Sequence, residues 1–198
     1  MKDMKYGIPG SFEVCLFMMK GVNRYAGSWG EAWRSFTIPL LTGLVAYYMA
    51  VIHPPLVKTS VSPELIFGIG YLTMILSMMI SLTIMFLFAK TMSRGERFPL
   101  MVSVANWTGL PFFLMILVFK TLETANLVGF KASEDVGIVL MIYSMSVSGY
   151  LITKTLRIHW FLGAFFAILG FIISQEVLNG LYYIFDVPVI DYSEYFSN

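Results

Sequence analysis

Long runs of apolar residues without a formal charge alternate along the chain with short segments that carry nearly all of the charge. Leu65 to Ala89 is an uncharged run of 25 residues, and Leu100 to Phe119 is an uncharged run of 20. About 20 apolar residues in a helix cross the hydrocarbon core of a bilayer, so each run predicts a transmembrane helix. Three further apolar segments, 36–53, 136–153 and 159–185, predict three more spans. The pattern therefore predicts an all-α, polytopic membrane protein with a bundle of five transmembrane helices.

Local signals mark where several of these helices begin and end. Ser28 and Glu31 have the spacing of a capping box, which predicts a helix that starts near Trp29. The sequence Ser62-Pro63-Glu64 offers the second span an N-cap, a proline at the first helical position and an acid in the first turn. Pro54-Pro55 predicts the end of the first span. Residues 120–135 are expected to form an outer loop, with 133–135 capping the fourth span.

The N-terminal segment precedes the first long apolar run and has a different pattern. Residues 1–10 contain two glycines and a proline and are expected to be loose. Residues 11–25 place apolar side chains at helical spacing and predict an N-terminal amphipathic interfacial helix. Whether its apolar face lies in the membrane interface or packs on the bundle stays open at this point. The expected division is a cytoplasmic segment over 1–28, a transmembrane domain over 29–185 and a far-side tail over 186–198.

Composition supports the assignment to the membrane. The chain is 58% hydrophobic and 13% charged, whereas soluble domains carry about 25% charged residues. The net charge of +1 argues against nucleic acid as a partner. Cys15 is the only cysteine, so no disulfide forms within the chain. The first long apolar run begins only after Arg34, so we expect the first span to be kept rather than cleaved as a signal peptide.

The distribution of basic residues predicts the orientation. With the N-terminus inside, the inner segments hold ten lysines and arginines, five of them up to Arg34, three in the 90–97 turn and two in the 154–157 turn. The outer segments then hold three, at positions 58, 120 and 131. The positive-inside rule favours this arrangement, with a cytoplasmic N-terminus and a far-side C-terminus.

Residues that could carry chemistry are few. The chain has no zinc-protease, redox-cysteine, phosphate-loop or nucleophile-elbow motif, and its two histidines, His53 and His159, fall at opposite ends of the predicted spans. We therefore expect no enzymatic activity, no metal and no cofactor.

Two polar residues within the spans are candidate sites. A carboxylate in a span is costly and is often functional, which singles out Glu176. The alternative is that Glu176 lies at the outer interface, where His53 or Lys58 is close enough to pair with it. Asn106 in the third span either bonds a neighbouring helix or contacts a substrate or lipid headgroup.

Small residues mark two spans for close packing. Ser144 and Ser148 lie on one face of the fourth span, and Gly163 and Ala167 lie on one face of the fifth. Small side chains let helix backbones approach within a membrane, so these four residues are candidate helix contacts.

Two segments around the predicted basic turns have a distinctive pattern, AKTMSRGERFPLMVSVANWTGLP, residues 89–111, and TLRIHWFLGAFFAI, residues 155–168. The first is a span that ends in a basic, glycine-containing turn before a span with a central proline, and the second enters the last span through a basic residue and a histidine. Both resemble the Yip1-domain family of membrane proteins, in its bacterial form. The resemblance covers residues 29–185 and implies a five-span integral membrane protein of the bacterial inner membrane without established catalytic activity. The acidic motif of the eukaryotic relatives, which is tied to vesicle trafficking, is absent here.

Two functional hypotheses follow from the sequence. The first is a non-enzymatic membrane protein that organises partner proteins, further copies of itself or lipids through its helix faces. The second is a small transporter or permease subunit with a polar path near Asn106 and Glu176. A membrane-embedded cavity lined by these two residues would favour the transporter.

Overall fold

A computed structural model describes residues 2–52, 62–125 and 127–187, and in these ranges the chain forms helices joined by short turns, with no strand. In chain order the elements are α1 (Lys2–Cys15), α2 (Met19–Val22), α3 (Trp29–Ser35), α4 (Thr37–Ile52), α5 (Pro63–Thr91), the 3-10 turn η1 (Gly95–Arg97), α6 (Phe98–Thr124), α7 (Phe130–Leu156) and α8 (Trp160–Ile184). The predicted all-α class is confirmed for the described residues.

Four of these helices, α5, α6, α7 and α8, are long and apolar enough to cross a membrane. Helices α5, α6 and α7 contain the predicted spans 65–89, 100–119 and 136–153, and α8 covers the predicted span 159–185 except for one residue at each end. The predicted first span, 36–53, corresponds to α4, which has 16 residues in the described part of the chain. Its last predicted residue, His53, and the expected stop at Pro54-Pro55 lie outside the described residues.

The predicted helix starts at Trp29 and Pro63 are confirmed. Ser28 Oγ accepts a hydrogen bond from the Glu31 backbone N–H at 3.2 Å, and the Glu31 carboxylate accepts one from the Gly27 N–H at 2.8 Å. Ser62 Oγ accepts from the Leu65 N–H at 3.3 Å. Both caps satisfy backbone donors that the first helical turn leaves without a partner.

The predicted outer loop over 120–135 is longer than the turn that joins α6 to α7, because α6 continues to Thr124 and α7 begins at Phe130. The predicted cap at 133–135 is wrong, because Gly129 is the N-cap residue of α7. Lys120 and Glu123 pair at 2.7 Å, three residues apart on α6. Charged pairs at this spacing stabilise a helix in water, so charged residues do not mark the ends of these helices.

Residues 2–10 were expected to be loose, and this is also wrong, because they form the first part of α1. The two glycines serve close packing there. A Cβ on Gly7 would lie 2.5 Å from the Trp107 ring, and one on Gly10 would lie 2.9 Å from the Tyr25 ring. The Tyr25 hydroxyl also donates to the Gly7 carbonyl at 2.9 Å. Contacts with residues distant in sequence thus keep this glycine-rich segment helical.

The single helix predicted over 11–25 is instead broken after Cys15. Phe17 has a φ of 58°, a left-handed conformation that ends a helix, and the chain turns there into the short α2. The Phe17 ring packs edge-on against Tyr150 of α7, with 5.4 Å between the ring centroids. The resulting α1–α2 unit packs on α6 and α7, and Tyr6, Ile8, Phe12, Leu16 and Met19 stay exposed on it.

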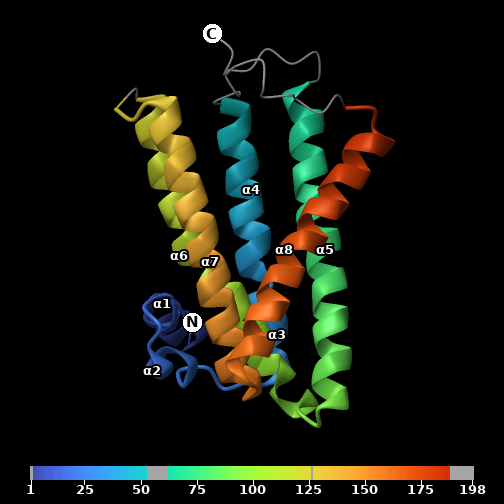
Figure 1. Cartoon of the computed structure of the whole chain (residues 1–198). Coiled ribbons are helices and arrows are strands. Elements are labelled where there is room, and N and C mark those ends of the chain that lie inside the picture. The colour runs from blue at the N-terminus through green and yellow to red at the C-terminus, as the bar shows by residue number, and fades with distance from the viewer. Residues whose placement is uncertain (1, 53–61, 126, 188–198) are drawn as a thin grey trace.

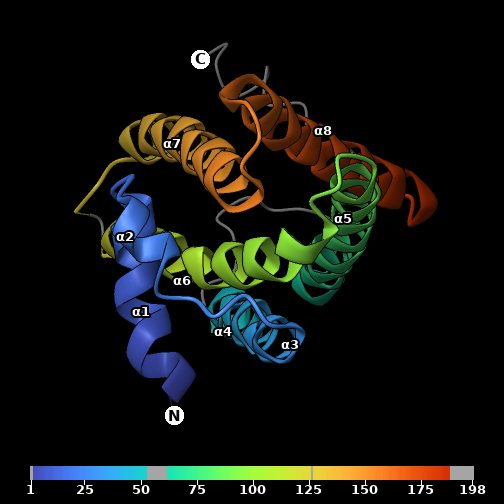
Figure 2. The same cartoon turned by 90° about the horizontal axis from the view of Figure 1, so that it is seen from below.

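The long helices are arranged in a ring in the order α5, α6, α7 and α8, and α4 lies beside α5 and α6 (Figures 1 and 2). The turns α5–α6 and α7–α8 lie at one end of the bundle, together with α1, α2 and α3 (Figure 1). We call this the basic end, because its two turns carry Lys90, Arg94, Arg97, Lys154 and Arg157. The buried apolar core gathers in the half of the bundle next to the basic end.

Candidate functional site: a cavity between α5, α6, α7 and α8

A cavity of about 390 Å³ lies between α5, α6, α7 and α8. Its walls are mostly apolar, and its lining includes Leu82, Met85, Met101, Phe112, Leu151 and Phe166. Met85, Met101 and Leu151 are also buried members of the core, so the core beside the basic end closes the cavity on that side. Elsewhere the cavity is partly open. Its volume lies in the range of small-molecule sites in proteins.

The cavity exists because α7 and α8 touch closely at one level. A Cβ on Gly163 would lie 2.4 Å from the Gly149 carbonyl oxygen and 2.1 Å from Thr153 Oγ1. The two backbones therefore meet at this point, and α8 leans away from α7 beyond it (Figure 1). Small residues on the diverging faces, Ser148 and Ala167 among them, leave space between the helices that larger side chains would fill.

Four hydroxyl groups provide the polar part of the lining, from Ser81, Thr108, Ser144 and Ser148. Thr108 donates to the Val104 carbonyl at 2.6 Å, and Ser144 donates to the Met141 carbonyl at 2.8 Å. A hydroxyl whose proton bonds its own helix still offers oxygen lone pairs to a ligand donor. Among the described residues, no acid, lysine, arginine or histidine belongs to the lining. The site can hold an apolar molecule and orient a few polar groups.

Asn106 does not line the cavity. Its Nδ2 donates to Ser35 Oγ at 2.9 Å, and Ser35 itself donates to the Ala32 carbonyl at 2.7 Å. Ser35 is 2% exposed, so this bond ties α6 to the end of α3 in a buried place. Of the two roles considered for Asn106, the geometry matches the bond to a neighbouring helix.

Glu176 also lies outside the cavity and is exposed on α8. Its two proposed partners, His53 and Lys58, lie outside the described residues. The structure therefore does not bring Asn106 and Glu176 together around a common space.

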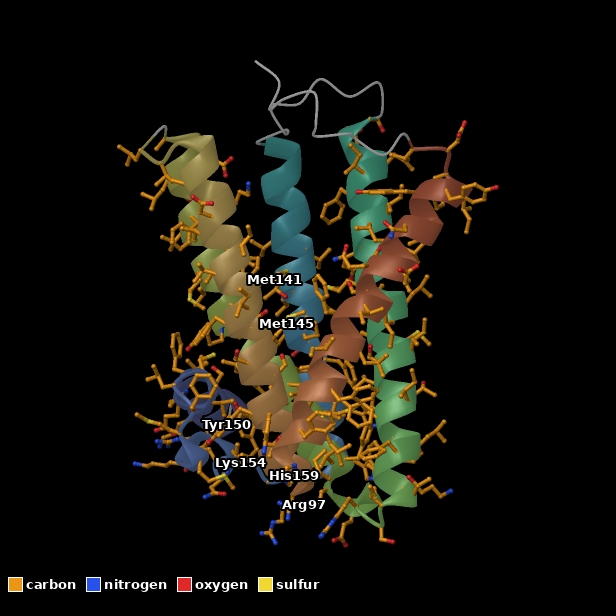
Figure 3. The ribbon with its side chains drawn as sticks, viewed as in Figure 1. Arg97, Met141, Met145, Tyr150, Lys154 and His159 are labelled. Atoms are coloured by element: carbon orange, nitrogen blue, oxygen red, sulfur yellow. The ribbon has the colours of Figure 1, made fainter. Side chains whose placement is uncertain are left out.

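His159 has a local role at the start of α8. It is the N-cap residue, and its Nδ1 accepts a hydrogen bond from the Phe161 N–H at 3.3 Å. Figure 3 places His159 at the basic end, near the level of Lys154 and Arg97. In the described ranges, no three His, Cys, Asp or Glu side chains gather in a way that could hold a metal ion.

The four candidate packing residues divide into two groups. Gly163 lies where the backbones of α7 and α8 approach each other closely. Ser144 and Ser148 line the cavity. Their small side chains leave room for the cavity and also allow neighbouring helices to approach. Ala167 is buried and also lines the cavity.

Sequence reasoning missed the contribution of α5 and α6 to the site. Ser81, Thr108 and Gly109 each interrupt an apolar run with a small or hydroxyl-bearing residue, which was the available signal. Such interruptions are common in membrane helices, so only the arrangement of the helices shows which of them face one another.

Comparison with family models, with curated proteins and with solved structures finds no match for this chain.

Proposed function

We propose that this chain is a non-enzymatic integral membrane protein that binds a lipid-like, predominantly apolar molecule between α5, α6, α7 and α8. The observation that carries this proposal is the cavity of about 390 Å³ with apolar walls and hydroxyl groups. In a bilayer an apolar, partly open cavity is filled from the surrounding lipid. The hydroxyl groups can select a molecule with an amide, ester or hydroxyl group near its apolar part. The proposed cavity site specifies how the protein would organise lipids, which is part of the first hypothesis drawn from the sequence.

The charge distribution supports a cavity binder over a transporter of ions or charged solutes. In the part of the chain that the structure describes, the lining holds no charged side chain, and neither Asn106 nor Glu176 belongs to it. A polar path between these two residues therefore has no support in the geometry.

The proposal includes a complete topology. It has five spans, α4 to α8, with the basic end on the cytoplasmic side because ten of the thirteen basic residues then lie inside. The α1–α2 unit lies in the inner interface, since it packs on α6 and α7 and also exposes apolar side chains such as Phe12 and Leu16. We keep membership of the Yip1-domain family and a bacterial inner-membrane location as parts of this proposal.

A substitution that fills the cavity tests the function. A Cβ at Gly109 has no atom within 4 Å, and Gly109 lines the cavity. Gly109→Phe should therefore occupy the cavity without a backbone clash and remove a glycine from a helix interior, which favours folding. Gly68→Phe is the matched control, because Gly68 is a helical glycine of α5 with open space around it and lies outside the cavity.

The measurement is native mass spectrometry of the full chain released from nonionic detergent. The original protein and Gly68→Phe should keep a co-purified apolar ligand, and Gly109→Phe should lose most of it at unchanged thermal stability. Equal ligand content in Gly109→Phe and Gly68→Phe would contradict the proposed site.

A further inference from the structure

Two turns that are far apart in the sequence come together at the basic end. Arg97, between α5 and α6, donates from Nε to the Thr155 carbonyl in the last turn of α7 at 2.6 Å. Arg94 and Arg157 are both close enough to repel the charge of the Arg97 guanidinium. Figure 3 shows Arg97 and Lys154 at this same end of the bundle. The hydrogen bond to Thr155 thus connects the two turns and brings Arg94, Arg97 and Arg157 near one another.

This cluster lacks matching negative charge. The two turns contain five basic residues and one acid, Glu96. Across the part of the chain that the structure describes, the guanidinium groups of Arg94 and Arg157 form no side-chain hydrogen bond and no ion pair. The bond to Thr155 uses only Nε of Arg97. Planar guanidinium groups with free N–H donors match the oxygens of a phosphate, which they bind through paired hydrogen bonds.

The backbone at Arg157 is a second, independent observation. Arg157 follows the last residue of α7 with a φ of 54°, a left-handed conformation that glycine adopts without steric cost. A glycine there would end α7 equally well and would remove the strain. The Arg157 backbone N–H donates to the Thr153 carbonyl, a bond that glycine makes equally well, so this helix end does not require the arginine side chain. A strained non-glycine residue at such a position points to a role for its side chain.

The surroundings point to a lipid and not to a soluble anion. Trp160 and Phe161 begin α8 three and four residues after Arg157, and they are 66% and 62% exposed. Large exposed aromatic side chains at the start of an apolar span belong at the headgroup level of a bilayer. A phosphate bound by these arginines would therefore carry apolar chains that continue along the lipid-facing surface.

We propose that Arg94, Arg97 and Arg157 bind the phosphate group of an anionic phospholipid at the basic end of the bundle. This site is distinct from the cavity, because none of these three arginines lines the cavity. The inference goes beyond the proposed function, and neither depends on the other.

The test measures binding of short-chain phosphatidylglycerol to the full chain in nonionic detergent by native mass spectrometry. Phosphatidylcholine and inorganic phosphate are the comparison ligands. A basic residue near an anionic surface contributes about fivefold in affinity, so Arg94→Gln and Arg157→Gly should each weaken phosphatidylglycerol binding by about that factor. Lys20→Gln removes an exposed charge from α2 and should leave binding unchanged.

Arg157→Gly separates binding from folding. Because it relieves the left-handed strain, its thermal stability without added lipid should equal or exceed that of the original protein while its binding falls. The proposal fails if the original protein binds phosphatidylcholine as well as phosphatidylglycerol. It also fails if Lys20→Gln weakens binding as much as the arginine variants, or if inorganic phosphate binds and phosphatidylglycerol does not.

Discussion

At the scale of single residues, the N-terminal unit shows how a few side chains fix a segment whose pattern is ambiguous. Arg24 forms two hydrogen bonds of 2.6 Å with the Glu13 carboxylate, which hold α1 against the segment after α2. The ion pair with Arg24 lowers the pKa of Glu13 below its usual value. Cys15, at the end of α1, is 5% exposed, and burial raises the pKa of its thiol to about 11. The Cys15 thiol is therefore buried and stays protonated at neutral pH.

The first prediction concerns the reactivity of Cys15. The thiolate is the reactive form, and its population rises with pH until the pH passes the pKa, so at pH 8 a thiol with a pKa of about 11 is only about 0.1% ionised. We expect iodoacetamide to label Cys15 at least about a hundredfold more slowly than an exposed thiol with an ordinary pKa of about 8.5. The exposed comparison is Ser93→Cys in a Cys15→Ala background, and labelling is followed by the mass of the intact protein. Equal rates at the two positions would mean that α1 does not pack as described.

At the scale of elements, the contact between α7 and α8 sets the shape of the bundle. The two helices come together where Gly149 faces Gly163, and α8 leans from there toward α5 (Figure 1). Lipid supplies no hydrophobic drive between apolar helices, so close backbone approach contributes much of their association. The hydrogen bond between Asn106 and Ser35 likewise holds α6 against α3.

The second prediction is that Gly163→Leu destabilises the protein. Its Cβ would meet the Gly149 carbonyl oxygen and Thr153 Oγ1 at distances that no side chain tolerates, so α8 would have to move. Overpacking of this kind costs about 1–3 kcal/mol of unfolding free energy, measured by thermal or denaturant unfolding in detergent. Gly68→Leu is the control, since Gly68 has open space around it and should tolerate the change. Similar losses for both variants would point to a general effect of bulk in the spans.

At the scale of the whole molecule, the packing is uneven along the bundle. The core lies near the basic end, whereas Ile138, Val139, Met141 and Ile142 of α7 are exposed toward the other end. In α8 only 11% of the most apolar 18-residue window is buried within the protein. Surface this apolar is stable only when lipid covers it, which agrees with helices long enough to cross a membrane.

The third prediction tests the number of spans and the orientation. In a Cys15→Ala background, single cysteines at Ala26, Glu64, Ser93 and Ala125, all exposed, are labelled with a membrane-impermeant maleimide in intact cells. If α4 to α8 all cross the membrane, Glu64→Cys and Ala125→Cys should react from outside, whereas Ala26→Cys and Ser93→Cys should react only after lysis. Reaction of Ala26→Cys and Glu64→Cys from the same side would show that α4 does not cross and would leave four spans.

By itself the sequence determined the features that depend on local physics. Long apolar segments located α5, α6, α7 and α8, because the cost of placing charge in hydrocarbon acts on each segment separately. Ser28 and Ser62 marked helix starts because capping involves only residues three positions apart. Only the tertiary structure decided that residues 2–10 are helical, since Trp107 and Tyr25 hold Gly7 and Gly10 from elsewhere in the chain. The tertiary structure also decided which helix faces enclose the cavity and that Arg157 lies near Arg97. Both features depend on how α5 to α8 pack, and no local sequence pattern encodes that packing.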